Sequence, residues 1–233
     1  MEKAKINPLH REKIETLEKN QLKIIQDENN YRFSLDSILL SKFINIKNRE
    51  RVIDLGTGCG IIPLMIYDPK KNNIIYAVEI QKKMVDIANK NVMLNNLENN
   101  IHVIHDDVQN LKNLFRNQFF DVVTANPPYI PIGKGKLNAI KEQKLARHEI
   151  NLNFESMVSI CSYLLKKRGR LYFIHRADNL ISIITTLKKY ILEPKILKFV
   201  YTGSNEKQNA KRVLIEARKD GGTELKVEKP IFL

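Results

Sequence analysis

The sequence has few cysteines, no long apolar run and no flexible linker. Cys59 and Cys161 are its only cysteines, and neither belongs to a cluster with the spacing of metal ligands. No apolar run approaches the roughly 18 residues that a membrane-spanning helix needs, and residues 1–15 lack the apolar core of a signal peptide. We therefore expect no metal site, no membrane contact and no signal peptide, and the scarcity of cysteine favours a reducing, cytoplasmic setting.

Acidic residues are too few to balance the basic ones. The chain has 39 Lys and Arg against 26 Asp and Glu, which gives a formal net charge of +13. An excess of this size favours a polyanionic partner, either nucleic acid or an acidic membrane surface. The competing interpretation is that a lysine- and asparagine-rich composition makes the chain basic without a specific partner.

The length and the hydrophobic pattern indicate one large α/β domain rather than two. From residue 51 onward, segments typical of strands alternate with segments typical of helices, as in parallel βαβ units. The expected strands are 51–55, 74–79, 101–105, 119–125, 169–175, 195–201 and 212–218, and the expected helices are 61–67, 81–96, 108–116, 152–166 and 178–190. This order predicts a doubly wound, Rossmann-like sheet.

Residues 1–50 are expected to form an extension packed on the main domain, which spans 51–233. Residues 1–20 are highly charged and weakly helical in pattern, and 22–26 and 31–33 are typical of the two strands of a hairpin. Ser34 is placed to cap an amphipathic helix that follows the hairpin.

A glycine-rich loop, DLGTGCG at 54–60, connects the first strand of the alternating region to its helix. Gly56, Gly58 and Gly60 permit a tight turn and close approach of a ligand to the backbone. Glu79 ends the next strand, where a carboxylate can bind both hydroxyls of a ribose. Strand, loop, helix, strand and acid in this order predict a cofactor site.

The same loop favours a cofactor without phosphate. The dinucleotide fingerprint has a small residue where this chain has Ile61, and the carboxylate of Asp54 would repel a pyrophosphate. It would attract the ammonium and sulfonium groups of S-adenosylmethionine. The expected cofactor contacts are Asp36, Asp54, Gly56, Thr57, Gly58, Gly60, Glu79, Asp107 and Asn126.

Two of these acids have an alternative role. Asp107 is placed for the adenine amino group of the cofactor, with Asp106 as its competitor, and either residue is equally suited to cap a helix. Asp36 lies near the start of the helix after the hairpin, where it either closes over the cofactor or interacts with the helix dipole.

The fourth strand of the alternating region ends in Asn126-Pro127-Pro128-Tyr129. In a doubly wound sheet this strand adjoins the first one, so the motif is expected beside the reactive end of the cofactor. The two prolines remove backbone donors, so the Asn126 side-chain oxygen and the Pro127 carbonyl can accept both hydrogens of a planar amino group, and Tyr129 offers a ring for stacking. An Asn-Pro turn alone does not explain the whole motif.

This arrangement predicts methyl transfer to an amine or amide nitrogen. Such a nitrogen gives its lone pair to a π system and is a poor nucleophile. Two acceptors that draw on its hydrogens favour pyramidal geometry and hold the nitrogen in line with the methyl carbon. No strong base is needed, because the proton can leave once the nitrogen is cationic.

The motifs DLGTGCG and NPPY are similar to those of adenine-N6, guanine-N2 and glutamine-N5 methyltransferases. From about residue 20 onward, YRFSLDSILLSKF, VIDLGTGCGIIPL, AVEIQ, DVVTANPPY, LARHEI, FIHRAD and KRVLIEARKDG closely resemble the bacterial valine-tRNA adenine-37 N6-methyltransferases. The resemblance implies a seven-stranded sheet whose last strand is antiparallel, and adenine 37 of the tRNA anticodon loop as the substrate. FIHRAD lacks the proline expected after HR, which affects only the local loop.

A basic segment follows NPPY, where substrate is expected to enter. We expect RNA phosphates or a flipped base to be bound there and at two nearby strand ends, by Lys134, Lys136, Lys141, Lys144, Arg147, His148, His175, Arg176, Lys211 and Arg212. The alternative is a solvated helix face laced with ion pairs. Glu142 has no basic residue three or four positions away, which disfavours that alternative.

Three functions remain open at this point. The first is tRNA adenine-N6 methylation, and the second is glutamine methylation of a release factor, because an amide presents the same two hydrogens. Release-factor enzymes usually carry a larger helical N-terminal domain than residues 1–50 can form. The third is RNA binding by a decayed methyltransferase fold, which the intact motifs disfavour. No feature indicates an oligomeric state.

Overall fold

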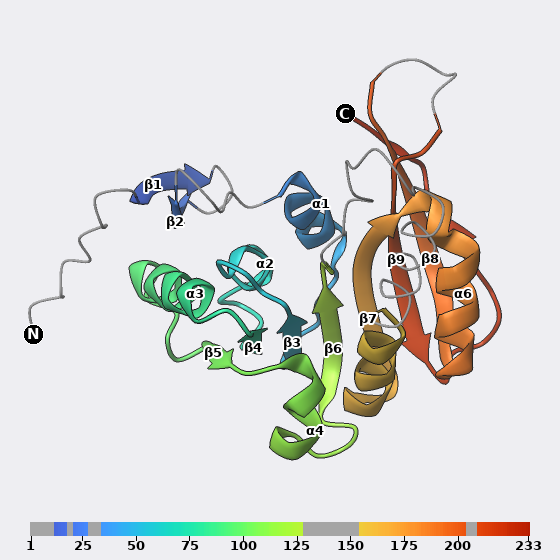
Figure 1. Cartoon of the computed structure of the whole chain (residues 1–233), viewed down its shortest axis with the longest axis horizontal. Helices are drawn as coiled ribbons and strands as arrows, with labels where there is room; N and C mark the ends of the chain where they lie inside the picture. Colours follow the sequence, from blue (N-terminus) through green and yellow to red (C-terminus); the bar gives the residue numbers. More distant parts are fainter. Residues whose placement is uncertain (1–11, 18–20, 28–33, 128–153, 204–208) are drawn as a thin grey trace, which may run out of the picture.

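The computed structural model describes residues 12–17, 21–27, 34–127, 154–203 and 209–233. Figure 1 shows a twisted sheet with helices on both sides and a small hairpin at the N-terminal end. Within the described ranges, no helix is both long and apolar enough to cross a membrane.

The strand order defines a doubly wound sheet. Its main path is β10-β8-β9-β7-β6-β3-β4-β5, and β11 also pairs with β8. Strand β9 is antiparallel to β7 and β8, and the other pairs in this sheet are parallel. The bounds are β3 Arg51–Leu55, β4 Ile74–Glu79, β5 Ile101–His105, β6 Phe120–Ala125, β7 Leu165–Arg176, β8 Leu192–Tyr201, β9 Arg212–Lys219, β10 Lys226–Val227 and β11 Ile231–Phe232. The predicted fold class is therefore confirmed.

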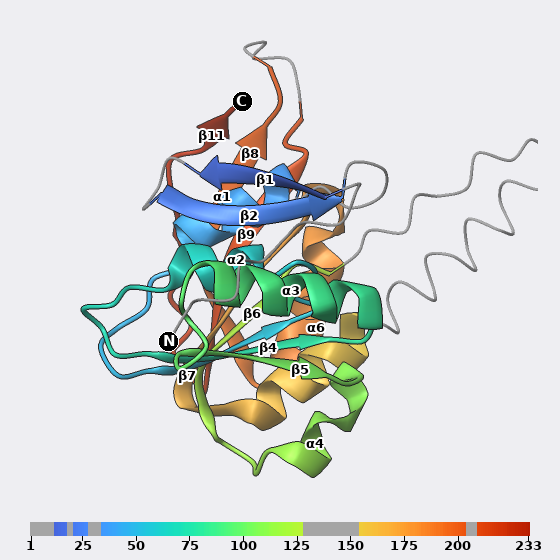
Figure 2. The same cartoon turned by 90° about the vertical axis from the view of Figure 1, so that its left-hand side faces the viewer.

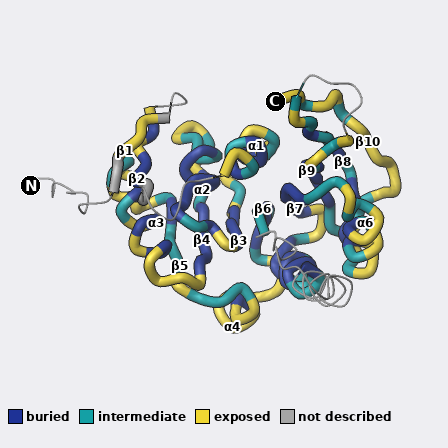
Figure 3. The backbone as a smooth tube through the Cα atoms, turned by 45° about the horizontal axis from the view of Figure 1, so that its top comes forward, coloured by how far each residue is buried: buried dark blue, intermediate teal, exposed yellow. Residues whose placement is uncertain are grey.

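Each face of the sheet carries its own apolar core. Along β3, Val52 packs into the core beneath α1, α2 and α3, whereas Ile53 packs into the core on the opposite face. A parallel sheet between two layers of helices is buried on both faces. In Figure 3 the residues of the central strands are mostly coloured as buried. The helices are α1 Leu35–Phe43, α2 Ile61–Ile66, α3 Lys82–Leu94, α4 Leu111–Leu114, α6 Leu180–Lys189 and an unlabelled helix at 154–164, with short 3₁₀ turns at Val108–Asn110 and Ala177–Asn179.

Several element boundaries differ from those expected from the sequence. The helix expected at 108–116 is a 3₁₀ turn followed by the four-residue α4. Strand β7 begins at Leu165, so the helix expected to reach residue 166 ends at 164. The two-residue strands β10 and β11 were not expected, because their pairing along the edge of β8 depends on tertiary contact rather than on local pattern.

The N-terminal hairpin uses different strands from those expected. Strand β1 Glu12–Leu17 pairs antiparallel with β2 Leu22–Asp27, so the expected weak helix is wrong at 12–17. The segment 22–26 is the second strand of the hairpin rather than the first. The other expected strand, 31–33, lies outside the described residues. Figure 2 shows β2 above α3.

Two asparagines, Asn91 on α3 and Asn95 directly after it, bind the edge of β2. Asn91 accepts a hydrogen bond from the Ile25 N–H (2.6 Å) and Asn95 accepts one from the Lys23 N–H (2.9 Å). The Asn95 side chain also donates to the Lys23 carbonyl (2.7 Å), and Asn91 donates to the carbonyl of Cys59 (2.9 Å). Two residues of strand advance about 6.7 Å and four residues of helix about 6 Å, so the spacings match. These asparagines thus act as a neighbouring strand would.

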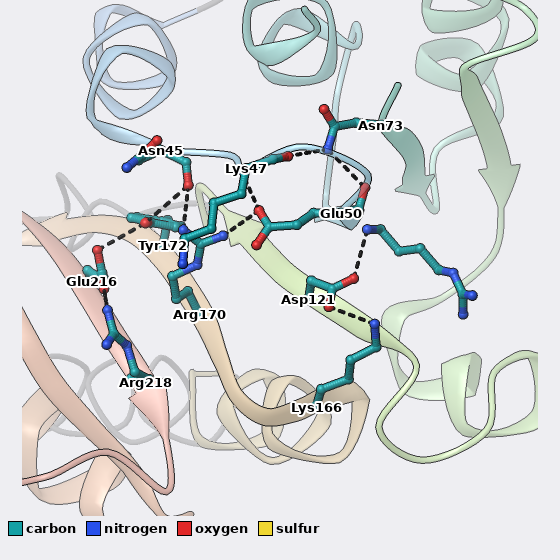
Figure 4. A network of polar contacts seen from close by, with 11 residues as sticks. Asn45, Lys47, Glu50, Asn73, Asp121, Lys166, Arg170, Tyr172, Glu216 and Arg218 are labelled. Carbon is teal, nitrogen blue, oxygen red and sulfur yellow. Dashed lines mark hydrogen bonds and ion pairs between the residues drawn. The ribbon is translucent and has the colours of Figure 1, made fainter. Parts of the chain in front are cut away.

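A polar network fixes the connection between α1 and β3 onto the sheet (Figure 4). Buried Arg170 on β7 donates to the Asn45 carbonyl (2.8 Å) and pairs with Glu50. The Tyr172 hydroxyl donates to Glu216 on β9 (2.9 Å), and burial raises its pKa. On the same side, Phe43 of α1 meets the Tyr172 ring edge-on at 5.8 Å. The position of α1 is therefore set by β7 and β9.

Replacing Asn91 by alanine should lower the free energy of unfolding by about 3 kcal/mol, because a buried N–H and a buried carbonyl lose this partner. Asn95→Ala is the matched control, and its exposed contacts predict a loss of about 1 kcal/mol or less. Urea unfolding of both variants measures the difference. Equal losses would contradict the larger cost expected from the buried contacts of Asn91.

Candidate active site

The glycine loop is fixed by contacts to β4. The Thr57 N–H donates to the Val78 carbonyl (2.9 Å) and the Gly58 N–H donates to Oε2 of Glu79 (3.0 Å). Gly60 has a φ of 82° and precedes α2, a left-handed conformation that strongly favours glycine. The loop therefore presents a defined backbone surface at the carboxyl edge of the sheet, as its sequence predicted.

Glu79 is buried at the end of β4 beside this loop. Its second oxygen, Oε1, accepts from the Gln81 N–H at 2.9 Å. The carboxylate thus joins the glycine loop to the start of α3. Each oxygen of an ionised carboxylate has a further lone pair, so a ribose hydroxyl can still donate to it.

Asp54 is fully buried at the end of β3, where β3 pairs with β6. Thr124 Oγ1 donates to Asp54 Oδ1 at 2.5 Å. Burial raises the pKa of Asp54 to about 7. The hydroxyls of Thr124 and Thr57 lower this pKa, and the nearby Glu79 raises it further. Among the described residues, Oδ2 of Asp54 and Oγ1 of Thr57 are buried without a hydrogen-bond partner, so Thr57 acts on the pKa by proximity rather than through a well-formed hydrogen bond.

A cavity of about 190 Å³ joins the two predicted motifs. It is lined by the start of α1, the glycine loop, the start of α2, Met84 and Asn126. Because β3 and β6 are adjacent and parallel, Asp54 and Asn126 leave the sheet at the same edge. This is the switch point at which doubly wound sheets bind ligands. The structure thus brings the glycine loop and Asn126 together.

Asn126 is bound by the N-terminus of α1. Its side-chain Nδ2 donates to Ser37 Oγ (2.9 Å) and to Ser34 Oγ (3.2 Å). Ser34 caps α1, as predicted, by accepting from the Ser37 N–H. Pro127 follows Asn126 in the described part of the chain, whereas Pro128, Tyr129, Lys134, Lys136, Lys141, Lys144, Arg147 and His148 lie outside the described residues.

Asp106 and Asp107 have local hydrogen-bond partners. Asp107 caps the 3₁₀ turn by accepting from the Gln109 N–H at 2.9 Å, and Asp106 accepts from its neighbour's N–H and from Asn110. The capping role is therefore present for Asp107. Its predicted contact to adenine stays a prediction.

The remaining predicted residues lie near the C-terminal end of β7 and the start of β9. Arg212 Nε donates to Asp36 Oδ2 at 2.8 Å, which joins α1 to β9. Arg176 pairs with Asp178, and Lys211 is exposed. His175 is only 4% exposed, packs against Phe154, and has a pKa lowered by burial. Their predicted contacts to substrate stay predictions.

Sequence reasoning missed two kinds of residue at this site. Ile80, directly after Glu79, is 58% exposed although it is apolar, and it was not among the predicted site residues. An apolar residue directly after the acid that ends a strand was the available signal. Ser37 was missed because its contact to Asn126 spans 89 residues of sequence.

The chain belongs to the Methyltransferase small domain family, which it matches over residues 33–179. It is thus a methyltransferase whose fold is that of the class I S-adenosylmethionine-dependent enzymes. The predicted family assignment is confirmed by relatives named tRNA1(Val) (adenine(37)-N6)-methyltransferase. One, from Aliivibrio salmonicida, is 28% identical over 183 residues, 78% of this chain and 75% of that protein. Another, from Phocaeicola vulgatus, is 27% identical over 195 residues, 84% and 80% of the two chains.

Solved structures show the same fold at low identity. TYW2 from M. jannaschii, solved with AdoMet, has a TM-score of 0.60 and 16% identity over 91% of this chain and 88% of that one. A protein from Agrobacterium tumefaciens, described as a predicted O-methyltransferase, has a TM-score of 0.64 and 19% identity over 85% and 87% of the two chains.

The raised pKa of Asp54 predicts a stability that falls as pH rises. The native state holds this proton up to about pH 7, whereas the unfolded chain loses it near pH 4. The native state therefore binds more protons between these values, and up to about 4 kcal/mol of stability is lost as pH rises through this window. Urea unfolding at pH 5 and pH 8 measures the part of this loss that falls above pH 5, about 3 kcal/mol. Asp54→Asn should remove most of the difference, and an unchanged difference in that variant would contradict the assignment.

Proposed function

We propose that this protein transfers a methyl group from S-adenosylmethionine to N6 of adenine 37 in a valine tRNA. The observation that carries the proposal is that one cavity is lined by both the glycine loop and Asn126. A cofactor site and an acceptor for an amino group are then contiguous, as transfer between the two requires. The relatives' names support adenine 37 as the target.

The residues at the carboxyl edge of the sheet fit this cofactor. Asp54 Oδ2 is buried without a partner among the described residues, and an unpaired buried acceptor is costly unless a ligand supplies a donor. The ammonium group of S-adenosylmethionine is such a donor, and it carries the charge that a carboxylate attracts. Gly56, Thr57, Gly58 and Gly60 permit its close approach.

Two further acids complete the proposed cofactor site. Glu79 accepts the ribose hydroxyls, and Asp107 and Ile80 receive the adenine ring. When bound, the cofactor supplies an electrophilic methyl group on a sulfonium. Asp36 is paired with Arg212, so its proposed contribution is to hold the start of α1 over the cavity.

Asn126 and Pro127 bind the target amino group in this proposal. The Asn126 Oδ1 and the Pro127 carbonyl each accept one hydrogen of the adenine N6 amino group, which favours a pyramidal nitrogen whose lone pair is less conjugated with the ring. Tyr129 stacks on the flipped base. As the new N–C bond forms, the bond from the methyl carbon to sulfur breaks and its electron pair stays on the sulfur. The nitrogen is then cationic, and its proton leaves to one of these acceptors or to water.

The net charge of +13 supports a nucleic-acid substrate rather than a protein one. The residues proposed to bind the tRNA are Lys134, Lys136, Lys141, Lys144, Arg147, His148, His175, Arg176, Lys211 and Arg212. Lys211 is exposed at the start of β9, near the edge of the sheet that carries Asn126. Because contacts to phosphate release counterions, binding of tRNA should weaken steeply with salt.

Labelled S-adenosylmethionine incubated in parallel with unmodified tRNA and unmodified release factor tests the proposal. The expected product, after digestion to nucleosides, is N6-methyladenosine from valine tRNA. Asn126→Ala should lower turnover at least 100-fold, because the acceptor that aligns the nitrogen is lost. Its affinity for S-adenosylmethionine, measured by calorimetry, should stay within about 2-fold of the wild type.

Two outcomes would contradict this account. Label in the release factor alone would mean that the NPPY motif binds a glutamine amide. Turnover in Asn126→Ala close to that of the wild type would show that the asparagine does not align the amino group.

A further inference from the structure

The side chain of Asn126 is held by a helix far away in sequence. Its Nδ2 donates to Ser37 Oγ at 2.9 Å and to Ser34 Oγ at 3.2 Å, contacts that span 89 and 92 residues. Both serines line the cavity that holds Asn126 and the glycine loop. The start of α1 thus forms the wall of the site that faces the asparagine.

The hydrogen bonds of the two serines favour one orientation of the amide. Ser34 Oγ accepts from the Ser37 N–H (3.2 Å) and from Asn126 Nδ2, and these two bonds use both lone pairs of the Ser34 oxygen. The Ser34 hydroxyl hydrogen then donates to Ser37 Oγ at 3.1 Å. Ser37 Oγ then accepts from Ser34 and from Asn126. This count gives four hydrogen bonds with the nitrogen of the amide toward α1, one more than these groups can form with the amide reversed.

The orientation matters because the oxygen and the NH2 group of an asparagine amide have similar size, but the oxygen accepts hydrogen bonds and the NH2 group donates them. With Nδ2 bound to α1, Oδ1 lies on the other branch of the planar group and is turned away from the serines. The reversed amide would present N–H donors to an amino group that itself donates. An asparagine turns about a broad, nearly two-fold torsion, so a fixed partner is needed to select one orientation.

The helix that carries the serines is itself fixed on two sides. Asp36 pairs with Arg212 at the start of β9, with a distance of 2.8 Å from Oδ2 to Nε. At the other end of α1, Phe43 packs edge-on against Tyr172 of β7. Because both anchors belong to the sheet, the serine hydroxyls are held at a set position relative to Asn126.

We propose that Ser37, assisted by Ser34, is a positioning residue for methyl transfer: it binds the Asn126 amide nitrogen and so directs the amide oxygen toward the acceptor nitrogen. The inference rests on the proposed function of Asn126. It assigns the N-terminal extension a part in turnover, as the segment that orients the asparagine.

Ser37→Ala should lower kcat about 10-fold, because one of two bonds that orient the amide is lost and misalignment directly weakens in-line attack. KM for S-adenosylmethionine should change by less than about 2-fold, because the cofactor contacts are intact. Ser41→Ala is the matched control. Ser41 lies one turn further along α1, is equally buried, and bonds to the Ile38 carbonyl and Met65 instead, so its kcat should not change.

A second readout does not depend on any substrate. In ¹⁵N-labelled protein, the Asn126 side-chain amide resonances, assigned by their loss in Asn126→Ala, should exchange slowly with solvent. Ser37→Ala should shift them and speed their exchange at least 5-fold, whereas Ser41→Ala should leave them unchanged.

The two readouts separate the inference from the proposed function. Unchanged amide resonances in Ser37→Ala, or an unchanged kcat in a protein that methylates adenine, would overturn the positioning role. If the wild type methylates no adenine while Ser37→Ala still shifts the resonances, the contact stands and the proposed function is wrong.

Discussion

The buried contact between Asp54 and Thr124 is the constraint on which the site depends. It joins the carboxyl ends of two adjacent parallel strands, β3 and β6, through a hydrogen bond of 2.5 Å. The glycine loop follows β3 directly, and Asn126 follows β6 directly. A parallel sheet places such ends at one edge, so the register of this pair decides whether the two motifs can line one cavity.

The N-terminal segment contacts the elements that form this site. Asn91 on α3 binds both β2 and the carbonyl of Cys59 in the glycine loop. Arg170 and Glu50 fix the connection that leads from α1 into β3. The polar side chains that anchor the extension therefore contact the same loop and strands that carry the proposed cofactor and substrate residues.

Features that depend on a local sequence pattern could be predicted from the sequence alone. The strand that ends in Asp54, the loop that follows and the place of Asn126 were all predicted, because buried strands and positive-φ glycines leave local signals. The hairpin was placed one strand too late, since Glu12–Leu17 is rich in charge and its two apolar residues, Ile14 and Leu17, do not follow the alternation typical of a strand. The contact of Ser37 with Asn126 and the pairing of β10 and β11 could not be predicted, because each depends on segments brought together only by the folded sheet.

The central claim is that Asp54 is kept buried to receive a cation, and proton release on cofactor binding tests it most directly. At pH 6 the free protein holds the Asp54 proton, since its pKa is about 7, and the α-amino group of S-adenosylmethionine is already charged. Binding should then release close to one proton, as calorimetry in two buffers of different ionisation enthalpy would measure. A release that stays near zero, or that persists in Asp54→Asn, would contradict the account.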